Sequence, residues 1–331
     1  KQRRHCRIRD LLSRAGSAVQ ALKPCLMMSP LSVSRFLPEG SVAFDLVIMD
    51  EASQIKPEDA IGTMLRAKQV VVVGDPKQLP PTSFFDRLEE EVDDDELTQL
   101  DNTESVLEAA MKVYQPFRRL RWHYRSKHES LIRFSNSRFY DNDLVVFPSP
   151  TCDRDSYGVR HVFVEDATCT GGLNPREAEA VVEEIVRHAI TRPDESLGVG
   201  TFNKTQSELI NELLEKRCQS DRAAVIAVDR IRHRDEGLFI KNLENLQGDE
   251  RDVIFVCYTY GKDPASGRLM QRFGPINSEN GWRRLNVLIT RSRHRMVVFS
   301  SFHPGDIQGG PDKSRGVNAY KDFLTYAMTG T

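Results

Sequence analysis

The sequence predicts an α/β fold built on parallel β-sheets. Short apolar runs rich in β-branched residues alternate along the chain with stretches of helical periodicity, which is the pattern of successive β-α-β units. These runs are nearly continuously apolar, as is typical of strands covered by helices on both faces. A length of 331 residues corresponds to roughly two domains. We therefore expect parallel-sheet domains, about two of them, in this chain.

The expected elements follow from these runs in chain order. Strands are predicted at Cys25–Met28, Asp45–Met49, Gln69–Val73, Val159–Val164, Leu197–Phe202, Asp252–Tyr258 and Arg295–Ser300. Helices are predicted at Pro57–Arg66, Thr103–Val113, Lys127–Phe139, Pro175–Thr191, Lys204–Cys218 and Tyr320–Met328. The helix that begins at Pro175 has the clearest pattern, because Ala178, Val181 and Ile185 follow the spacing of one apolar helix face.

Composition and charge exclude several classes of protein. With 46 Lys and Arg against 48 Asp and Glu, the formal net charge is −2, so any basic surface for nucleic acid must be local. No apolar run approaches the ~20 residues of a membrane helix, and no membrane partner is expected. The six cysteines are scattered without a CxxC pair, which favours a reducing, cytoplasmic compartment over a disulfide framework.

A pair of carboxylates follows the strand that ends at Met49, in the run Asp45-Leu-Val-Ile-Met-Asp50-Glu51-Ala-Ser-Gln54. The carboxyl ends of parallel strands form the ligand-binding edge of open α/β folds. Nucleotide hydrolysis needs such a pair: one acid, here Asp50, holds Mg²⁺ through water, and the other, Glu51, orients or deprotonates the attacking water. Taken alone, the same pattern also fits plain helix capping.

A second apolar strand ends at Gly74-Asp75, one predicted helix further along, and runs into a loop with Pro76, Pro80 and Pro81. Prolines fix the backbone of such a loop. Gln78 within it has an amide that could bond a terminal phosphate or its attacking water. A proline-rich structural turn is the alternative, which the preceding pair of carboxylates disfavours.

These two motifs resemble motifs II and III of the superfamily 1 helicases, most closely the 1B branch that includes the RNA helicase of nonsense-mediated decay. Further motifs follow in the family's order. Leu120-Arg-Trp-His-Tyr124-Arg125-Ser resembles motif IV, Gly200-Thr201-Phe-Asn203-Lys204-Thr-Gln206 motif IVa, Asn245-Leu-Gln247-Gly248-Asp-Glu250-Arg-Asp252 motif V, and Arg283-Arg-Leu-Asn286-Val-Leu-Ile-Thr290-Arg291-Ser-Arg293 motif VI. Residues 241–252 and Phe273-Gly-Pro-Ile-Asn277 also resemble large bacterial multidomain helicase-like proteins.

The resemblance implies two RecA-like parallel-sheet motor domains, of which the first is incomplete. We place the C-terminal part of the first domain, with motifs II and III, at residues 1–117, and the second domain, with motifs IV, V and VI, at residues 118–331. The implied activity is that of a helicase or translocase motor. Such a motor couples hydrolysis of ATP, with Mg²⁺, to movement on single-stranded DNA or RNA.

The resemblance also implies roles for single residues. Arg125 and Arg291 are implied to be arginine fingers, because a planar, permanently charged guanidinium matches the phosphate oxygens of the transition state. The residues implied to lie at the nucleotide are Asp75, Gln247, Gly248 and Glu250. Glycine at 248 lets the backbone approach a phosphate closely, whereas Glu250 has the alternative role of a local salt bridge.

Contacts to nucleic acid are expected mainly at phosphates, through hydroxyl groups, backbone N–H groups and a few cations. The candidates are Ser29 and Pro30 after the first predicted strand, Pro81 and Thr82 in motif III, and Thr201, Asn203 and Lys204 in motif IVa. The rings of Trp122 and Tyr124 could stack on a base, but aromatic residues beside a strand more commonly pack in a core.

The family's phosphate-binding Walker A loop, G-x-x-x-x-G-K-[ST], is not found in these residues. The nearest string, Gly62-Thr-Met-Leu-Arg-Ala-Lys68, lacks the second glycine and the hydroxyl. The chain begins at Lys1 without a methionine, and we expect that the N-terminal part of the first motor domain has been cut away. The chain alone should then bind ATP poorly and hydrolyse it negligibly, and the remainder of its parent chain is its expected partner.

Two other functions compete with this interpretation. A catalytically inactive nucleic-acid-binding or scaffolding module of helicase fold is disfavoured, because Glu51, Gln78 and Arg125 are all present. A nuclease that uses the carboxylates of Asp50 and Glu51 for metal-assisted cleavage is disfavoured too, because no further acids lie at a suitable spacing.

Overall fold

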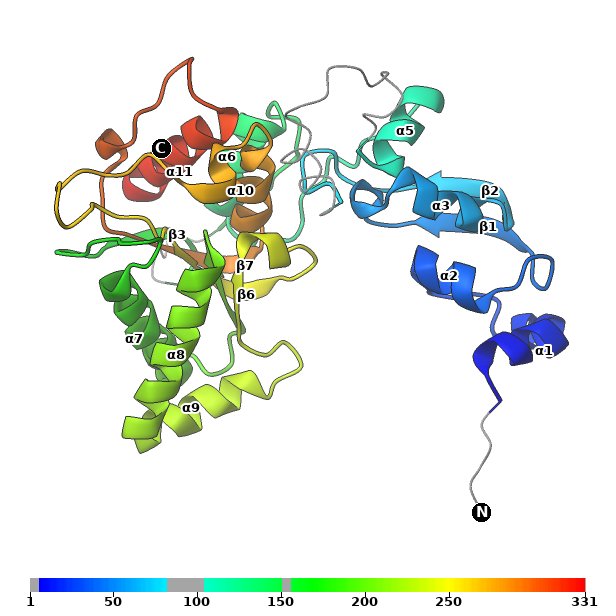
Figure 1. Cartoon of the computed structure of the whole chain (residues 1–331), viewed down its shortest axis with the longest axis horizontal. Helices are drawn as coiled ribbons and strands as arrows, with labels where there is room; N and C mark the ends of the chain where they lie inside the picture. Colours follow the sequence, from blue (N-terminus) through cyan, green and yellow to red (C-terminus); the bar gives the residue numbers. More distant parts are fainter. Residues whose placement is uncertain (1–5, 82–103, 151–155, 331) are drawn as a thin grey trace. The chain divides into compact units, whose positions relative to one another are not determined.

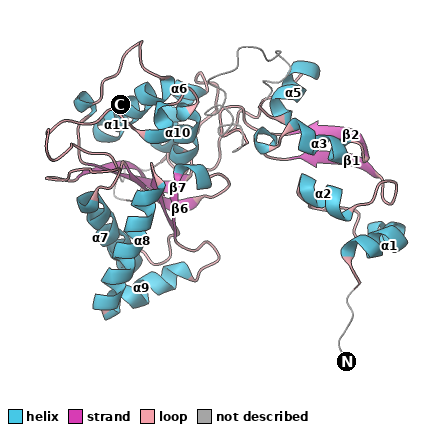
Figure 2. Cartoon of the chain, in the orientation of Figure 1, coloured by secondary structure: helices cyan, strands magenta, loops and turns pink. Residues whose placement is uncertain are grey.

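A computed structural model of the chain describes residues 6–81, 104–150 and 156–330. Its contacts divide the chain into two compact units, unit 1 (Lys1–Arg119) and unit 2 (Leu120–Thr331). Both units mix helices with parallel strands (Figures 1 and 2). The predicted α/β fold class with parallel sheets is confirmed.

Unit 1 contains a two-stranded parallel sheet with a helix in the connection. Its described elements are α1 (Ile8–Leu22), α2 (Pro30–Phe36), β1 (Phe44–Met49), the 3-10 helix η1 (Ala52–Gln54), α3 (Pro57–Met64), β2 (Ala67–Val72) and α5 (Val106–Val113). The strands pair in register from Phe44 with Ala67 to Met49 with Val72. They therefore end side by side, which places the residues after β1 next to those after β2.

The apolar core of unit 1 is small. One cluster joins Met49 and Ala52 to Val106 and Leu107 of α5, and another gathers residues of α1, of α2 and of the segment between α2 and β1. Several apolar strand side chains remain outside these clusters: Leu46 is 44% exposed, and Ile48 is 63% exposed. Among the described residues, the sheet of unit 1 is thus covered on one face only.

Unit 2 contains a five-stranded parallel sheet in the order β3-β7-β6-β4-β5. Its described elements are α6 (Ser130–Phe139), β3 (Gly158–Phe163), α7 (Pro175–Thr191), β4 (Leu197–Thr201), α8 (Lys204–Ser220), α9 (Arg222–Arg232), β5 (Phe239–Asn242), η2 (Leu243–Asn245), β6 (Arg251–Cys257), η3 (Gly274–Asn277), α10 (Gly281–Ile289), β7 (Ser292–Ser300), η4 (Pro304–Asp306) and α11 (Arg315–Thr329).

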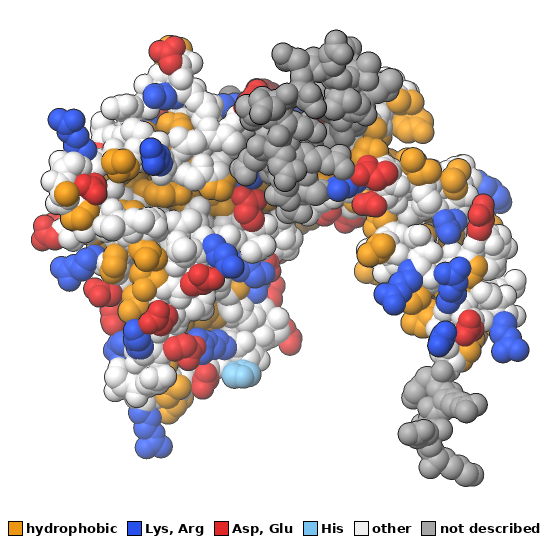
Figure 3. All heavy atoms as spheres, in the orientation of Figure 1, with side chains coloured by type: hydrophobic (Ala, Val, Ile, Leu, Met, Phe, Trp, Pro, Cys, Tyr) orange, Lys and Arg blue, Asp and Glu red, His pale blue; other side chains and the backbone are white. Residues whose placement is uncertain are grey.

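Helices cover both faces of this sheet. α7, α8 and α9 lie on one face and α6, α10 and α11 on the other (Figure 1), so the central strand β6 is buried from Val253 to Cys257. Acidic and basic side chains are interspersed over α7, α8 and α9 (Figure 3). Ion pairs such as Arg217 with Glu183 link these helices. Within the described ranges, none of the helices combines the length and the apolar character that a membrane crossing requires.

Most predicted elements are confirmed. The helix Pro175–Thr191 has the predicted bounds, and the structure contains every predicted strand except Cys25–Met28. That prediction is wrong: the segment is a partly exposed loop between α1 and α2. A strand needs a neighbour to satisfy its backbone groups, and the described residues provide none beside it. Thr103, the predicted first residue of α5, lies outside the described residues.

Other helices differ from their predicted bounds or were not predicted. α11 begins at Arg315 rather than at Tyr320, and α6 begins at Ser130 rather than at Lys127. The α-helices and strands that the sequence analysis does not predict are α1, α2, α9, α10 and β5. Strand β5 spans only four residues, which is too short for its sequence to show a clear period of two.

Candidate nucleotide and nucleic-acid sites

The first group of candidate residues follows β1 at the carboxyl edge of the unit 1 sheet. Asp50 and Glu51 come directly after Met49, and both are exposed. Glu51 adopts a left-handed conformation with φ 50° and ψ 39°, and its N–H donates to Asp50 Oδ1 at 2.9 Å. A left-handed backbone is uncommon outside glycine, and here it turns the chain sharply from β1 into η1.

Motif III lies beside this turn through backbone hydrogen bonds. The Val73 N–H donates to the Met49 carbonyl at 2.8 Å, and the Ala52 N–H donates to the Val73 carbonyl at 2.9 Å. Gly74 comes next, where an added Cβ would lie 3.0 Å from the Ser53 nitrogen. Because a side chain has so little space there, glycine permits the close approach of the two motif loops.

Asp75 organises the loop that carries Gln78. Its Oδ1 accepts from the Lys77 N–H at 2.9 Å, and its Oδ2 accepts from Gln78 Nε2 at 2.9 Å. The Gln78 amide is thereby oriented by Asp75. Pro81, a candidate nucleic-acid contact, is buried within the chain, and Thr82 lies outside the described residues.

The residues after β1 fit a bound magnesium ion. Mg²⁺ is a hard cation that prefers carboxylate oxygens and usually keeps several waters. Asp50 and Glu51 provide two exposed carboxylates in succession, and one Asp50 oxygen is already oriented by its bond to the Glu51 N–H. An exposed, oriented carboxylate of this kind suits contact through a metal-bound water.

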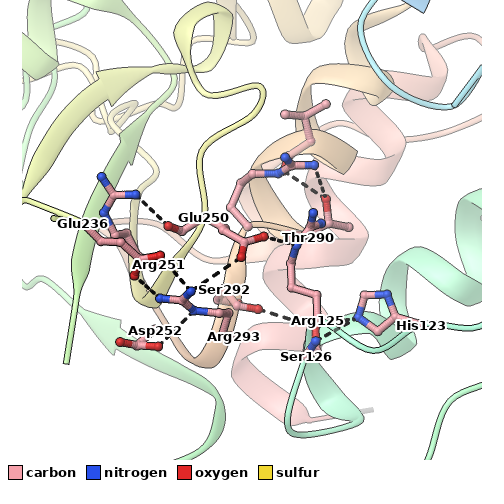
Figure 4. Close-up of polar contacts among 12 residues, drawn as sticks. His123, Arg125, Ser126, Glu236, Glu250, Arg251, Asp252, Thr290, Ser292 and Arg293 are labelled. Carbon is pink, nitrogen blue, oxygen red and sulfur yellow. Dashed lines mark hydrogen bonds and ion pairs between the residues drawn. The ribbon is translucent and has the colours of Figure 1, made fainter. Parts of the chain in front are cut away.

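The second group lies at the amino ends of β6 and β7 in unit 2 (Figure 4). Arg125 Nε donates to Glu250 Oε2 at 2.6 Å, and Arg125 Nη1 donates to the Thr290 carbonyl at 3.3 Å. The Lys127 N–H donates to the Arg293 carbonyl at 2.7 Å, which fixes the segment after Arg125 to β7. The structure thus brings motifs IV, V and VI together around Glu250.

Arg293 stands at the centre of this group. It donates through Nε to Asp252 Oδ1 at 3.0 Å and through Nη1 to Glu236 Oε1 at 3.0 Å, and its Nη1 lies 3.5 Å from Glu250 Oε1. The bond to Glu236, the largest contribution, together with the nearby carboxylates, raises the pKa of Arg293. We call Arg125, Glu236, Glu250, Asp252 and Arg293 the arginine cluster.

His123 closes one side of the arginine cluster. Its Nε2 accepts from the Ser126 N–H at 3.2 Å and lies 2.8 Å from Ser126 Oγ. Burial and, secondarily, the positive charge of Arg125 lower the pKa of His123 to about 4. The ring is therefore neutral at physiological pH, and the positive charge of the arginine cluster comes from Arg125 and Arg293.

Arg291, the second predicted finger, is folded back on its own helix end. Its side chain is buried, and its Nε donates to the Val287 carbonyl at 2.8 Å. Its Nη2 donates to Thr290 Oγ1 at 3.3 Å. Cations at a helix C-terminus compensate its exposed carbonyl groups, so Arg291 here has the geometry of a C-terminal cap of α10.

The turn between η2 and β6 carries the motif V residues. Gly248 has φ +86°, and no atom lies within 4 Å of the position where a Cβ would stand. The positive φ favours glycine, and the open space leaves its backbone accessible. Gln247 beside it is half-buried.

The motif IVa residues lie at the opposite edge of the sheet, because Thr201 at the end of β4 pairs with Cys257 at the end of β6. Asn203 caps α8: its side chain accepts from the Gln206 N–H at 2.7 Å and donates to the Gly172 carbonyl at 2.8 Å. Thr201 is buried and donates to the Asn203 carbonyl. Lys204 is exposed, 3.6 Å from Glu208.

Ser29 and Pro30 form a similar helix start in unit 1. The Ser29 hydroxyl accepts from the Ser32 N–H at 3.2 Å, and Pro30 is the first residue of α2. Both residues thus have a capping role, which their residue types favour. Trp122 and Tyr124 are 61% and 79% exposed, so the expectation that they pack in a core is wrong.

The sequence analysis missed a buried carboxylate at the carboxyl edge of the unit 2 sheet. Glu177, in the first turn of α7, is fully buried and accepts from the Thr259 N–H at 2.7 Å and from Cys257 Sγ at 3.1 Å. Burial raises its pKa to about 7. Asn174 caps the same helix, and an Asn followed three residues later by Glu is a helix-start signal.

Comparisons with known proteins agree with this arrangement of motifs. A family model described as an AAA domain matches residues 102–303, and a second AAA domain model matches residues 31–85. The chain is 33% identical over 318 residues to an uncharacterized ATP-dependent helicase of Mycoplasma genitalium, an alignment that covers 93% of this chain and 28% of that protein.

Two further matches are more distant. The DNA replication ATP-dependent helicase/nuclease of Gallus gallus is 25% identical over 260 residues, which covers 77% of this chain and 23% of that protein. The solved structure of the PRRSV helicase matches at 15% identity and a TM-score of 0.34, covering 76% of this chain and 34% of that chain. The chain spans about a quarter of the length of these curated relatives.

The first AAA domain model covers more than half of the 331 residues. Its match includes motifs IV, V and VI, and the second model includes the Asp50–Glu51 and Asp75–Gln78 segments. The chain therefore belongs to the AAA domain family, in its superfamily 1 helicase branch.

Proposed function

We propose that this chain is part of an ATP-driven motor of the 1B type, which couples ATP hydrolysis to movement on single-stranded DNA or RNA. The observation that carries the proposal is the arginine cluster. Arg125, Glu250 and Arg293 come from three motifs that are far apart in sequence, and they meet within hydrogen-bond or ion-pair distance. Packing of the core does not by itself require charged residues of three separate motifs to meet at the amino ends of β6 and β7.

In this proposal the two units supply different groups for the same reaction. ATP with Mg²⁺ supplies the phosphoryl group and the metal charge when bound. Asp50 would hold Mg²⁺ through a water, Glu51 would take a proton from the attacking water, and Gln78, oriented by Asp75, would position that water. Arg125 and Arg291 stabilise negative charge on the phosphate oxygens.

The fingers must be released before they can act. Arg125 bonds Glu250 and Arg291 bonds the end of α10. A terminal phosphate offers a guanidinium two charge-assisted bonds in place of those contacts. We propose that Glu250 holds Arg125 in reserve and that Gly248, with its open backbone, and Gln247 also contact the nucleotide.

We propose that the missing phosphate-binding loop belongs to the remainder of the parent chain. Two observations support this: the 331 residues contain no G-x-x-x-x-G-K-[ST] string, and the sheet of unit 1 keeps apolar side chains such as Ile48 exposed. A segment that completed the sheet would cover those side chains. The nucleic-acid contacts proposed are Ser29, Pro30, Pro81, Thr82, Thr201, Asn203 and Lys204.

The experiment compares ATPase rates of the 331-residue chain and of its full parent, each with single-stranded DNA, single-stranded RNA or neither. We expect negligible hydrolysis by the chain alone and a rate in the parent that a single strand stimulates. Robust ATPase activity of the isolated chain contradicts the proposal that the phosphate-binding loop belongs to the remainder of the parent chain. An inactive parent that still binds single strands supports the second candidate, a nucleic-acid-binding scaffold; the observation in its favour is that Arg291 is folded back on the end of α10.

A further inference from the structure

Unit 2 contains a cavity of about 540 Å³ between the end of α6 and the start of α11. Its lining includes Arg138, Phe139, Lys313, Arg315, Asn318 and Asp322. None of these residues belongs to the helicase motifs identified in the sequence. The volume lies in the range of small-ligand sites in proteins.

The walls of the cavity are held in place by hydrogen bonds. α6 and α11 run in opposite directions, because the Tyr326 hydroxyl donates to the Ser130 carbonyl at 2.7 Å at one end. At the other end, Arg315 Nη2 donates to the Arg138 carbonyl at 3.1 Å. The Asn318 side chain bonds both the N–H and the carbonyl of Gly310, each at 2.9 Å. The loop before α11 is therefore fixed rather than dependent on a ligand.

Positive charge exceeds negative charge on these walls. Arg138, Lys313 and Arg315 line the cavity against a single carboxylate, Asp322. Arg138 forms an ion pair with Asp322, which leaves the charges of Lys313 and Arg315 in excess. The amino end of α11 adds the positive end of a 15-residue helix dipole.

Arg315 is oriented before any ligand arrives. Its guanidinium lies 4.0 Å from the ring centre of Trp282, a cation–π contact that restricts its rotamers. Partial burial lowers the pKa of Arg315; the carboxylate of Asp141 opposes this effect, and the positive charges of Arg138 and Arg283 add to it. An anion in the cavity would stabilise the charged form of this guanidinium.

We propose that this cavity binds a phosphate group. A guanidinium matches phosphate oxygens with its planar fork, and a lysine adds a compact charge. The rings of Phe139 and Trp282 are only 1% and 7% exposed, so a base finds no open aromatic face for stacking. Recognition is therefore of the phosphate and independent of base identity. The phosphate comes either from a nucleic-acid strand or from a small free polyphosphate.

The test uses the full 331-residue chain and two variants of the cavity. Lys313→Glu reverses a charge on an exposed side chain, and Arg315→Lys keeps the charge while removing the fork. Lys216→Glu is the matched control, because it makes the same charge change on exposed α8, beside Glu212. The melting temperature of each variant checks that it is folded.

Two binding measurements distinguish the phosphate sources. Calorimetric titration with inorganic pyrophosphate reports a free polyphosphate, and fluorescence anisotropy of a labelled oligothymidine of about 20 nucleotides at several salt concentrations reports a strand. We expect Lys313→Glu to weaken binding at least ~10-fold relative to Lys216→Glu in one of the two measurements, and Arg315→Lys to weaken it by a smaller factor. If a strand is the ligand, the salt dependence should also fall by about one phosphate contact.

Each outcome has a defined meaning. A loss confined to pyrophosphate identifies a small-ligand site, and a loss confined to the oligothymidine identifies an extension of the strand path. If both cavity variants bind pyrophosphate and the oligothymidine as the Lys216→Glu control does, the cavity is not a phosphate site. That result would leave the motor function untouched, because no cavity residue has a role in it.

Discussion

The two units bury their strand side chains to very different degrees. In unit 2, Ile254 of the central strand β6 is fully buried between two layers of helices, whereas Ile48 of β1 in unit 1 is 63% exposed. A two-stranded sheet is at best marginally stable by itself, and three or more strands with a covered face are needed for independent stability. Unit 2 therefore has the features of a self-sufficient domain, which the described part of unit 1 does not have.

The same contrast applies to the candidate functional groups. The carboxylates of Asp50 and Glu51 are exposed at the end of their strand, whereas Arg125 and Arg291 are engaged in contacts within unit 2. The two carboxylates are accessible to solvent, and Arg125 and Arg291 must exchange their present contacts before they can bind a phosphate.

The largest expected effect comes from removing one group of either unit in the parent protein. Arg125→Ala and Glu51→Gln should each lower the ATPase kcat by about 10³-fold or more, because a phosphoryl-transfer finger is worth ~10³–10⁵ in rate. The measurement is steady-state ATP hydrolysis with a saturating single strand. Arg217→Ala is the control, since Arg217 pairs with Glu183 on the helical face of α7 and α8 and should leave kcat unchanged.

This experiment tests whether both units contribute essential groups to hydrolysis. If Glu51→Gln abolishes hydrolysis while Arg125→Ala keeps more than a tenth of it, the arginine cluster is structural and the finger role is wrong. Glu250→Gln adds a finer test. If Glu250 holds Arg125 in reserve, its loss should raise the ATPase rate without a strand and leave the stimulated rate similar.

The second expected effect concerns the stability of the two sheets. Ile254→Ala removes a fully buried side chain and should cost about 2–5 kcal/mol of unfolding free energy in unit 2. Ile48→Ala, at an exposed position, should change the stability of unit 1 by less than about 0.5 kcal/mol. Urea unfolding of the 331-residue chain, fitted with separate transitions for the two units, measures both changes.

The same two substitutions, Ile254→Ala and Ile48→Ala, can also be measured in the parent protein. If the remainder of the parent covers the sheet of unit 1, Ile48→Ala should cost several times more there than in the isolated chain. An equally small cost in both proteins argues against a covered sheet and against the proposed completion of unit 1.

The third effect is a pH dependence confined to unit 2. Burial raises the pKa of Glu177 from the usual 4.5 to about 7, so the folded protein holds a proton there that the unfolded chain releases. Stability from this group is therefore present at acidic pH and is lost as the pH rises through 7, by about 2 kcal/mol between roughly pH 5 and pH 8. Glu177→Gln, which does not titrate, should lose that dependence.

Three histidines titrate with the opposite sign, so the wild type alone does not isolate Glu177. Burial lowers the pKa of His123, His161 and His188, for the first two to about 4. Their contribution to stability rises with pH until the unfolded rings lose their protons near 6.5. The quantity to measure is the difference in unfolding free energy between wild type and Glu177→Gln across this range. A difference that does not change with pH shows that Glu177 is ionised throughout.

Local patterns account for much of the fold but not for the destinations of the charged side chains. The apolar stripe of Pro175–Thr191 specifies its own helix, and the runs before Asp50 and Gly74 specify strands. Cys25–Met28 has the composition of a strand but no neighbour among the described residues, and pairing is not encoded in four residues. The partner of Arg125, Glu250, lies 125 positions away, so only the assembled sheet determines that contact.

The candidate sites divide in the same way. The order of the motifs identified the residues near both strand ends in unit 1, because β1 and β2 are adjacent in sequence and in space. In unit 2 the sequence did not show which motif residues lie at the carboxyl ends of the strands and which lie at the amino ends. Thr201 lies at the carboxyl edge and Glu250 at the amino edge, a distinction that depends on strand direction and order rather than on any residue type.

The smallest expected effect distinguishes capping from strand binding at the two helix starts. Asn203→Ala removes the cap of a 17-residue helix and should cost about 1 kcal/mol in unit 2, and Ser29→Ala, on the 7-residue α2, should cost about the same or less in unit 1. Asn203→Asp preserves the acceptor for the Gln206 N–H but adds a negative charge. If Asn203 contacts a phosphate, Asn203→Asp should keep its melting temperature and bind an oligothymidine strand several-fold more weakly. If Asn203→Asp changes neither the strand affinity nor the stability, Asn203 acts only as a helix cap. The nucleic-acid strand then does not contact the carboxyl end of β4 through Asn203.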